Sequence, residues 1–196
     1  MKDQVSVLNE IIENRSSVFT SQFTGEEVSD DIIDNMLENA NWAPTHKFTE
    51  PWRFVIFKGE GRKKLADFQS ELYRKITKKD GTFRESRFEN LKQKPFSASH
   101  VIVVGMARDP EEKVPEIEEI TSLGCAIQNM YLTATANGVG CYLSTGGITY
   151  FEGANELFGL GAKDKLIGFL FVGMPKSWPL KSKRGSIKNK CKWVRS

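Results

Sequence analysis

Hydrophobic residues follow two patterns along this chain, one helical and one made of continuous apolar runs. Steps of three and four residues between Val5, Leu8 and Ile12 predict a first amphipathic helix. Further helices are predicted downstream. Three of them run from Ser29 to Asn41, from Ile117 to Asn137 and, as a short segment, from Phe151 to Gly159. A fourth carries Leu65, Phe68, Leu72 and Ile76 on one face.

Four apolar segments predict strands. They run from Trp52 to Phe57, His100 to Ala107, Val139 to Leu143 and Leu166 to Val172. The second and the fourth are almost purely apolar, as expected for strands that are buried on both faces. The order of the elements predicts an α+β fold, in which helices sandwich a central mixed or antiparallel sheet of about four to five strands. No repeat or low-complexity linker interrupts the chain, so residues 1–196 are expected to form a single domain.

Two segments depart from this pattern of helices and strands. Residues 78–97 are rich in charge but also contain Phe83, Phe88 and Phe96, which indicates that part of the segment packs. We therefore expect a lid-like, mobile and partly helical excursion there, with disorder as the alternative. Residues 175–196 form a basic C-terminal extension that is expected to be extended.

The composition is that of an ordinary globular protein, with 39% hydrophobic and 27% charged residues. A formal net charge of +3 is too small to indicate a nucleic-acid partner by itself. No apolar run approaches the ~20 residues of a membrane span, and the acidic, amphipathic N-terminus is unlike a signal peptide. We expect a cytoplasmic protein with neither a membrane nor a nucleic-acid partner.

Few residues are available for metal or nucleotide chemistry. The three cysteines are odd in number and widely spaced, and there are only two histidines, which excludes a histidine-rich metal site. The P-loop motif is absent. Gly138 and Gly140 are followed by Cys141, Tyr142 and Leu143, so the dinucleotide motif G-x-G-x-x-G fails as well.

Three motifs, taken in order, point to one family of proteins. The first is Arg15-Ser16-Ser17, after the N-terminal helix. The second is Trp42-Ala43-Pro44-Thr45-His46-Lys47, followed by Glu50-Pro51-Trp52-Arg53-Phe54. The third combines Gly138-Val139-Gly140 with Ile167-Gly168-Phe169, Gly173-Met174-Pro175 and the basic tail. Together they resemble the nitroreductase family of FMN enzymes over nearly the whole chain. The Ala-Pro-x-His-Lys sequence resembles its short, minimal branch.

The resemblance implies a phosphate site for FMN at Arg15, Ser16 and Ser17, with Arg184 joining from the C-terminal tail. A phosphate dianion needs cations and hydroxyl donors, and this turn supplies one guanidinium and two hydroxyl groups. The alternatives are a solvated helix end and an ordinary charged tail.

The resemblance also implies two segments around the isoalloxazine ring. One contains Trp42, Pro44, Thr45 and His46, and the other contains Leu143, Ser144 and Thr145, followed by Gly146 and Gly147. The two glycines permit a close approach of the main chain to the ring. The alternatives are a loop histidine without a ligand and a simple turn after a strand.

This chain departs from the family pattern at four positions. Ser16 and Phe19 stand where the family often has arginines, Phe48 where it commonly has Asn, and Glu50 where it has Gln. The loss of a side-chain amide affects recognition of the pyrimidine edge of the flavin. A carboxylate close to that edge opposes the negative charge of reduced flavin unless it points away.

The activity implied by the resemblance is ping-pong transfer of electrons. NADH or NADPH gives a hydride to flavin N5, and a nitroaromatic, a quinone or a similar small-molecule acceptor then takes the electrons. No catalytic side chain and no metal ligand is implied, because the flavin carries the chemistry. Alternatives are another flavin reaction on the same fold, such as dehalogenation or ring oxidation, and a non-catalytic flavin-binding or interaction protein.

Family members are homodimers with the flavin at the subunit interface, so the resemblance implies a homodimer here. The predicted helix from Ile117 to Asn137 is apolar around much of its surface. Such a helix lies either in a core or in an interface, and the pattern does not distinguish the two.

Overall fold

The computed structural model describes residues 3–180 and 183–195, and its core is one antiparallel sheet covered by helices. The helices are α1 (Gln4–Asn14), α2 (Asp30–Asn41), α3 (Gly61–Lys79), α4 (Glu85–Gln93) and α5 (Glu116–Ala136). The strands are β1 (Trp52–Lys58), β2 (His100–Met106), β3 (Gly140–Ser144) and β4 (Lys165–Gly173). The α+β fold and the antiparallel four-stranded sheet confirm the prediction from the sequence.

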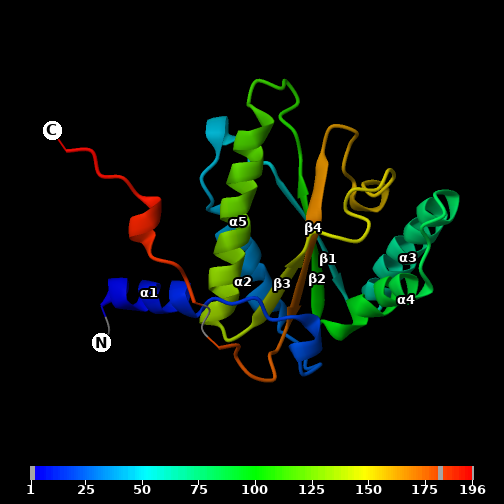
Figure 1. Cartoon of the computed structure of the whole chain (residues 1–196), viewed down its shortest axis with the longest axis horizontal. Helices are drawn as coiled ribbons and strands as arrows, with labels where there is room; N and C mark the ends of the chain where they lie inside the picture. Colours follow the sequence, from blue (N-terminus) through cyan, green and yellow to red (C-terminus); the bar gives the residue numbers. More distant parts are fainter. Residues whose placement is uncertain (1–2, 181–182, 196) are drawn as a thin grey trace.

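The strand order β1-β2-β4-β3 places β2 and β4 in the centre and β3 at one edge. Helices α2 and α5 lie on one face of the sheet, and α3 and α4 lie on the other (Figure 1). Every residue of β2 is buried, and its side chains alternate between the two faces. Helices on both sides thus explain why this strand is a continuous apolar run.

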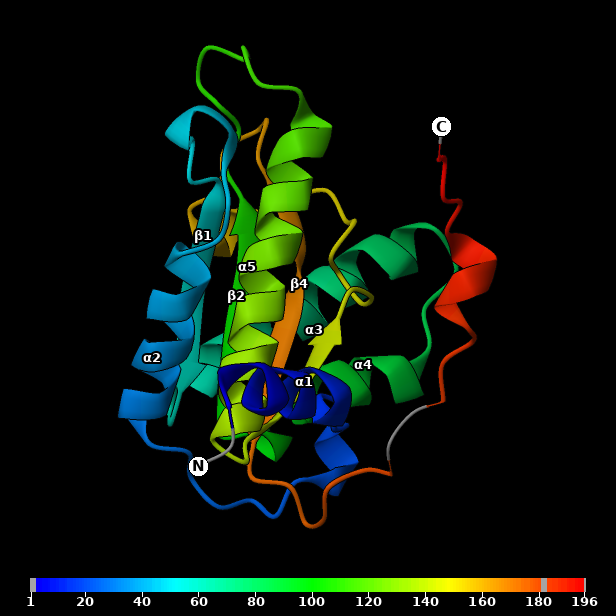
Figure 2. The same cartoon turned by 90° about the vertical axis from the view of Figure 1, so that its left-hand side faces the viewer.

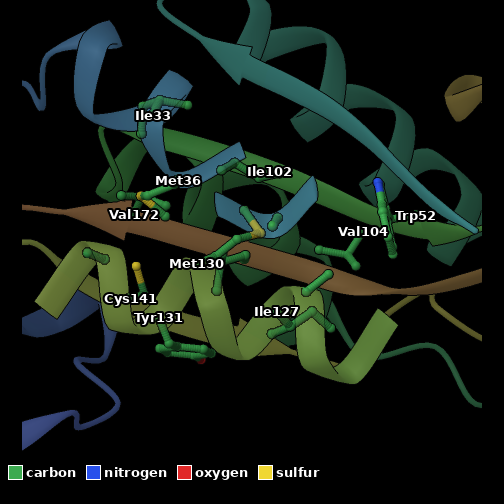
Figure 3. Close-up of a cluster of buried hydrophobic side chains, with 14 of the residues drawn as sticks. Ile33, Met36, Trp52, Ile102, Val104, Ile127, Met130, Tyr131, Cys141 and Val172 are labelled. Atoms are coloured by element: carbon green, nitrogen blue, oxygen red, sulfur yellow. The ribbon is translucent and has the colours of Figure 1, made fainter. Parts of the chain in front are cut away.

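A hydrophobic core fills each side of the sheet. Met36 of α2 and Met130 of α5 pack against Ile102 and Val172 on one face, as Figure 3 shows. On the other face α3 and α4 pack against the opposite side of the same strands. Helix α1 lies across the last turns of α5 (Figure 2).

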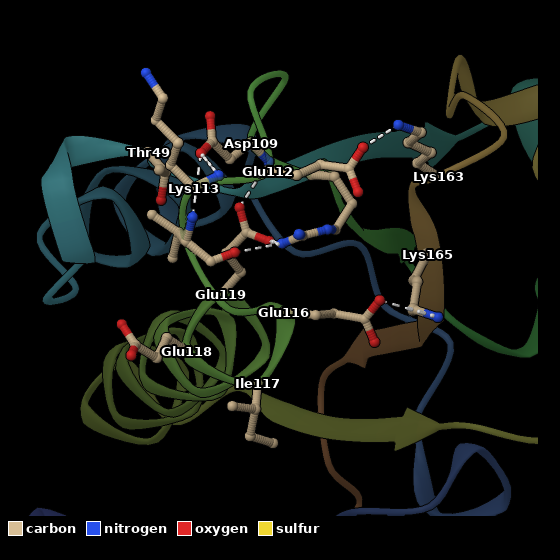
Figure 4. Close-up of polar contacts among 12 residues, drawn as sticks. Thr49, Asp109, Glu112, Lys113, Glu116, Ile117, Glu118, Glu119, Lys163 and Lys165 are labelled. Atoms are coloured by element: carbon tan, nitrogen blue, oxygen red, sulfur yellow. Dashed lines mark hydrogen bonds and ion pairs between the residues drawn. The ribbon is translucent and has the colours of Figure 1, made fainter.

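The start of α5 is held by a buried ion pair. The Glu119 side chain is completely buried and pairs with the guanidinium of Arg108. Its carboxylate also accepts a hydrogen bond from the Asp109 N–H at 2.7 Å, and Arg108 donates to the Val114 carbonyl at 3.1 Å. These contacts, shown in Figure 4, join the loop after β2 to the first turns of α5.

The charged segment 78–97 is more regular than the sequence indicates. Helix α3 continues to Lys79, α4 follows, and a 3₁₀ turn covers Lys94–Ser97. Phe83 and Phe88 pack in the core on this face, whereas Phe96 is 46% exposed. The prediction of a partly helical segment is confirmed, and its lid role stays a prediction.

The predicted helix from Phe151 to Gly159 is wrong. Only Glu156–Phe158 forms a 3₁₀ turn, and the rest is a series of turns. Gly153 and Gly159 have φ angles of +82° and +68°, which lie in the left-handed region and break a right-handed helix.

In its described residues, 175–180 and 183–195, the C-terminal extension is extended except for a 3₁₀ turn at Ile187–Lys190. Lys181, Ser182 and Ser196 lie outside the described residues. Within residues 3–180 and 183–195, none of the helices combines the length and the apolar character that crossing a membrane requires.

Candidate functional site

The residues predicted to bind a flavin lie in two separate places. Arg15, Ser16 and Ser17 lie beside β3, where Ser17 bridges to Cys141 and is connected through Tyr131 to Leu143. Pro44, Thr45 and His46 lie beside the first turns of α5, whereas Trp42 lies at the end of α2 and donates to Glu38. Glu118 in the first turns of α5 and Tyr131 near its end are 13 residues apart, or about 20 Å along the helix axis. Within one copy of the chain, His46 therefore lies far from the main chain that Tyr131 contacts at Leu143.

The N-terminal segment covers the free edge of β3. Ser17 forms a parallel bridge with Cys141, and the Val18 N–H donates to the Cys141 carbonyl at 2.9 Å. Gly140 permits this approach, because a Cβ there would lie 2.8 Å from the Cβ of Val18. Ser17 is exposed and Ser16 is buried, as the alternation of an extended segment requires.

Tyr131 of α5 connects this segment to the end of β3. The guanidinium of Arg15 lies 5.5 Å from the centre of the Tyr131 ring. The hydroxyl of Tyr131 accepts a hydrogen bond from the Leu143 N–H at 2.8 Å and is also hydrogen-bonded to Ser17. Burial raises the pKa of Tyr131, so the phenol is neutral at pH 7. The sequence pattern carries no signal for this role, since a tyrosine within an apolar helix is typical of a core aromatic.

A cleft of about 230 Å³ lies beside the end of β3, and we call it the β3 cleft. One wall is the segment 142–147, and Phe171 of β4 contributes from the sheet. Arg87 and Asn90 of α4, together with Lys94, form the opposite wall. The cleft therefore joins a segment predicted to contact the flavin to cations from the segment 78–97.

Lys94 brings a partly desolvated positive charge into the β3 cleft. Its Nζ donates to the Ser144 Oγ at 3.3 Å and lies 4.9 Å and 4.6 Å from the ring centres of Tyr142 and Phe171. Burial lowers the pKa of Lys94, and the nearby charge of Arg87 lowers it further. Among the described residues neither cation forms an ion pair with a carboxylate. The cleft is therefore suited to an anionic or electron-rich group.

The second segment forms a strained loop on the opposite side of the molecule. Lys47, Phe48 and Glu50 have φ angles of 50°, 54° and 42°, in the left-handed region that disfavours residues with a Cβ. The Thr45 hydroxyl accepts a hydrogen bond from the Glu50 N–H at 3.1 Å. Backbone strain of this kind is often retained at functional sites.

Polar contacts fix the loop against α5 and α2. The Nδ1 atom of His46 lies 2.6 Å from the Oε2 atom of Glu118, and Pro44, Thr45 and His46 line a shallow cavity of about 320 Å³ with α5. Trp42 is 78% exposed, and its indole N–H donates to Glu38 at 3.2 Å. Large apolar side chains are thus exposed here, and no other described part of the chain covers them.

Arg184 is not brought to either segment. It is exposed, and its guanidinium donates to the carbonyl of Lys183 at 3.2 Å. Its role at a phosphate stays a prediction, as do the individual roles of the other predicted site residues. Lys94 and Arg87 were missed because a cation in a charged segment usually indicates only a solvated surface.

The comparisons with known proteins decide the family. The model of the nitroreductase family matches residues 12–174. The chain belongs to the nitroreductase family. This nitroreductase-family chain is 31% identical to the Escherichia coli (strain K12) protein named "Putative NAD(P)H nitroreductase YdjA" over 153 residues, which is 78% of each chain. It is 30% identical to the Bacillus subtilis (strain 168) protein named "Putative NAD(P)H nitroreductase YfhC" over 187 residues, which is 95% of this chain and 94% of the relative.

More distant relatives and solved structures extend the comparison. Iodotyrosine deiodinase of Hydra vulgaris is 28% identical over 78% of this chain and 60% of its own length. The nitroreductase-like family protein of Bacillus cereus has a TM-score of 0.83 at 30% identity, with both chains covered fully. The FMN-dependent nitroreductase NfnB of Mycobacterium smegmatis, solved with NADPH, has a TM-score of 0.74 at 16% identity. The match covers 98% of this chain and all of that one. The similarity to NfnB shows that the two chains share a fold.

Proposed function

We propose that this member of the nitroreductase family is an FMN-dependent oxidoreductase that takes electrons from NADH or NADPH. It passes them to a nitroaromatic, a quinone or a related small acceptor. The observation that carries the proposal is the β3 cleft, where Lys94 and Arg87 lack carboxylate partners among the described residues and face the segment 142–147. The names of the relatives YdjA and YfhC support the use of NAD(P)H.

The donor set around β3 fits FMN. Arg15 and Ser17 offer a guanidinium and an exposed hydroxyl for the phosphate, and Tyr131 ties them to the main chain at Leu143. The segment that follows contains Gly147, whose φ of +74° is accessible to glycine. The phosphate and the ring thus have adjacent sites along one strand.

Bound FMN supplies hydride and electron transfer. The residues of the chain orient the reactants and stabilise charge. Lys94 and Arg87 place positive charge beside the segment 142–147, which stabilises negative charge that develops there. Tyr142 and Phe171 form an apolar floor that excludes water, and this strengthens the electrostatic effect.

The complete site requires two copies of the chain. The loop with His46 lies beside the first turns of α5, about 20 Å along the helix axis from Tyr131, which is bonded to the main chain at Leu143. We therefore propose that this loop of one protomer closes the β3 cleft of its partner. Helix α1 presents an uncovered apolar stripe of Val5, Leu8 and Ile12, which are 46–67% exposed. Burial of this stripe against a second copy is the expected driving force.

The visible absorption spectrum of freshly purified protein tests the proposal. We expect a flavin spectrum and release of FMN on denaturation. Arg15→Ala should weaken FMN binding on the order of 10- to 100-fold, because a charge-assisted hydrogen bond to the phosphate is lost. Arg74→Ala is the control, since Arg74 forms an exposed ion pair with Glu71 on α3. A colourless protein that takes up no added FMN contradicts the proposal and favours the non-catalytic binding protein.

Reductive dehalogenation is a second candidate reaction, favoured by the similarity to an iodotyrosine deiodinase. It uses the same flavin site with a halogenated phenol as the acceptor. Release of halide from such a phenol, with no turnover of nitroaromatics or quinones, would place this reaction first.

A further inference from the structure

A second and larger cleft lies between α3 and α4, and we call it the α4 cleft. Its volume is about 630 Å³. Arg84 and Arg87 line it together with Asn90 and with hydroxyl groups from Tyr73 and Ser86. None of the described carboxylates lines this cleft, although Glu85 and Glu89 lie on the same helix. All of its polar side chains can therefore donate hydrogen bonds, which is the chemistry of an anion site.

The two arginines are not engaged elsewhere in the described part of the chain. Neither guanidinium has a hydrogen bond, an ion pair or an aromatic ring contact among the described residues. Other cations nearby are engaged: Arg74 pairs with Glu71, and Lys78 and Lys92 lie over phenylalanine rings. The availability of Arg84 and Arg87 thus distinguishes them from the solvated charge around them.

The position of Arg84 is fixed by the fold. Its N–H donates to the hydroxyl of Tyr73 at 3.2 Å, and the Tyr73 side chain is buried in the core below. Arg84 is the N-cap residue of α4, with an extended backbone, and Arg87 lies in the first turn of the helix, so both reach the same cleft. The cleft therefore presents two guanidinium groups together.

The α4 cleft is adjacent to the β3 cleft. Arg87 and Asn90 line both, and Lys94 follows further along the same helical surface. A row of cations therefore runs from the α4 cleft to the segment 142–147. A molecule with its reactive ring in the β3 cleft can extend past Arg87 and place an anionic group at Arg84.

We propose that the α4 cleft binds the carboxylate or phosphate of the molecule that reacts in the β3 cleft, and so selects anionic substrates. This rests on the proposed function of the β3 cleft. Carboxylate and phosphate match the planar fork of arginine equally well. The anion can belong to the electron acceptor or to the nicotinamide dinucleotide, and ping-pong kinetics separate the two because each half-reaction has its own KM.

The experiment compares nitrobenzene with 4-nitrobenzoate as acceptors, and NADH with NADPH as donors. Arg84→Gln should lower kcat/KM for 4-nitrobenzoate by about tenfold and leave nitrobenzene unchanged, because one charge-assisted contact is lost. If Arg84→Gln lowers kcat/KM for NADPH alone and leaves kcat/KM for both acceptors unchanged, the same site is supported, with the dinucleotide as the source of the anion. Arg74→Gln is the matched control. Equal kcat/KM values in wild type and Arg84→Gln for every charged probe would overturn the proposal.

Binding is also measured without turnover, from the NMR shifts that 4-nitrobenzoate causes in the guanidinium signals of Arg84 and Arg87. Shifts in the wild type that Arg84→Gln abolishes support the site. Absence of shifts in an enzyme that uses 4-nitrobenzoate overturns it. If the protein holds no flavin but the shifts are present, the proposed function fails and the anion site stands.

Discussion

His100 is a buried histidine whose hydrogen bonds define its tautomer. Its side chain is 1% exposed, and Nε2 lies 3.1 Å from the carboxylate of Asp30, which accepts a hydrogen bond. The Ser99 hydroxyl lies 2.9 Å from Nδ1 and itself accepts the Val28 N–H at 2.8 Å. Burial favours the neutral ring, which donates from Nε2 to Asp30 and accepts the Ser99 hydroxyl at Nδ1. Burial lowers its pKa, and the hydrogen bond to Asp30 opposes this only partly.

The free energy of unfolding should consequently fall on acidification. The unfolded chain binds a proton at His100 below its ordinary pKa of about 6.5, whereas the folded chain binds it only at lower pH. The stabilising effect of the neutral ring is thus complete above about pH 6.5 and is lost as the pH falls toward the folded pKa. Urea denaturation between about pH 7.5 and 5.5 measures this, and His100→Gln should remove most of the slope.

His46 provides the control, since the chain has only two histidines. It is half exposed and lies in the loop beside Glu118. Comparison with His46→Gln separates the effect of removing His100 from that of removing a histidine elsewhere in the chain. A slope that persists in His100→Gln would show that another group is responsible.

At the level of elements, the contact between the N-terminal segment and β3 organises the candidate site. Gly140 lies against Val18, which is completely buried, and this contact positions Arg15 and Ser17 beside the end of the strand. The motif with Gly140 and the motif with Arg15 are far apart in sequence. Their meeting along one edge depends on this close backbone approach.

Gly140→Ala should destabilise the fold by about 1–3 kcal/mol, because the added methyl group overpacks this contact. It should also weaken FMN binding, since Val18 can give way only by moving the segment that carries Arg15. Urea denaturation and a flavin titration measure the two effects. Gly61→Ala is the control, as a Cβ at Gly61 meets nothing within 4 Å. An unchanged stability of Gly140→Ala would contradict the role of this contact.

The bounds of the strands and helices show which local sequence signals were sufficient to predict an element. Strands β2 and β4 were predicted within about two residues, because burial on both faces leaves an unmistakable apolar run. Helix α4 was only partly foreseen, because its charged residues hide the few apolar positions that pack. The helix predicted over 151–159 failed because the conformations of Gly153 and Gly159 are set by the surrounding turns.

At the level of the whole molecule, one copy of the chain separates the two segments predicted to contact the flavin. Exposed apolar side chains occur on α1, on the loop with Trp42 and Phe48, and in the C-terminal extension with Trp193. A second copy would cover such surfaces and would bring the two segments together. The homodimer stays a prediction, as does the cytoplasmic location.

We expect the protein to sediment as a dimer with about twice the chain mass of 22.2 kDa. Leu8→Asp should shift it to monomer and reduce retained FMN, because a charge in the apolar stripe of α1 opposes burial. Analytical ultracentrifugation and the flavin-to-protein ratio measure both effects. Asn9→Asp adds the same charge beside the stripe and is the control. A monomer that keeps stoichiometric FMN would refute the shared site.

The sequence by itself determined the fold class, the sheet and the family. Periodic burial is a local signal, and the motifs at Arg15, Pro44 and Gly138 keep their order along the chain. Only the tertiary structure decided that Lys94, Arg87 and Arg84 form a row that has no carboxylate partner in the described part of the chain, and that Tyr131 connects two motifs. A lysine in a charged segment and a tyrosine in an apolar helix have the same sequence signature whether or not they serve a site. Their surroundings come from packing between distant segments, which local pattern does not encode.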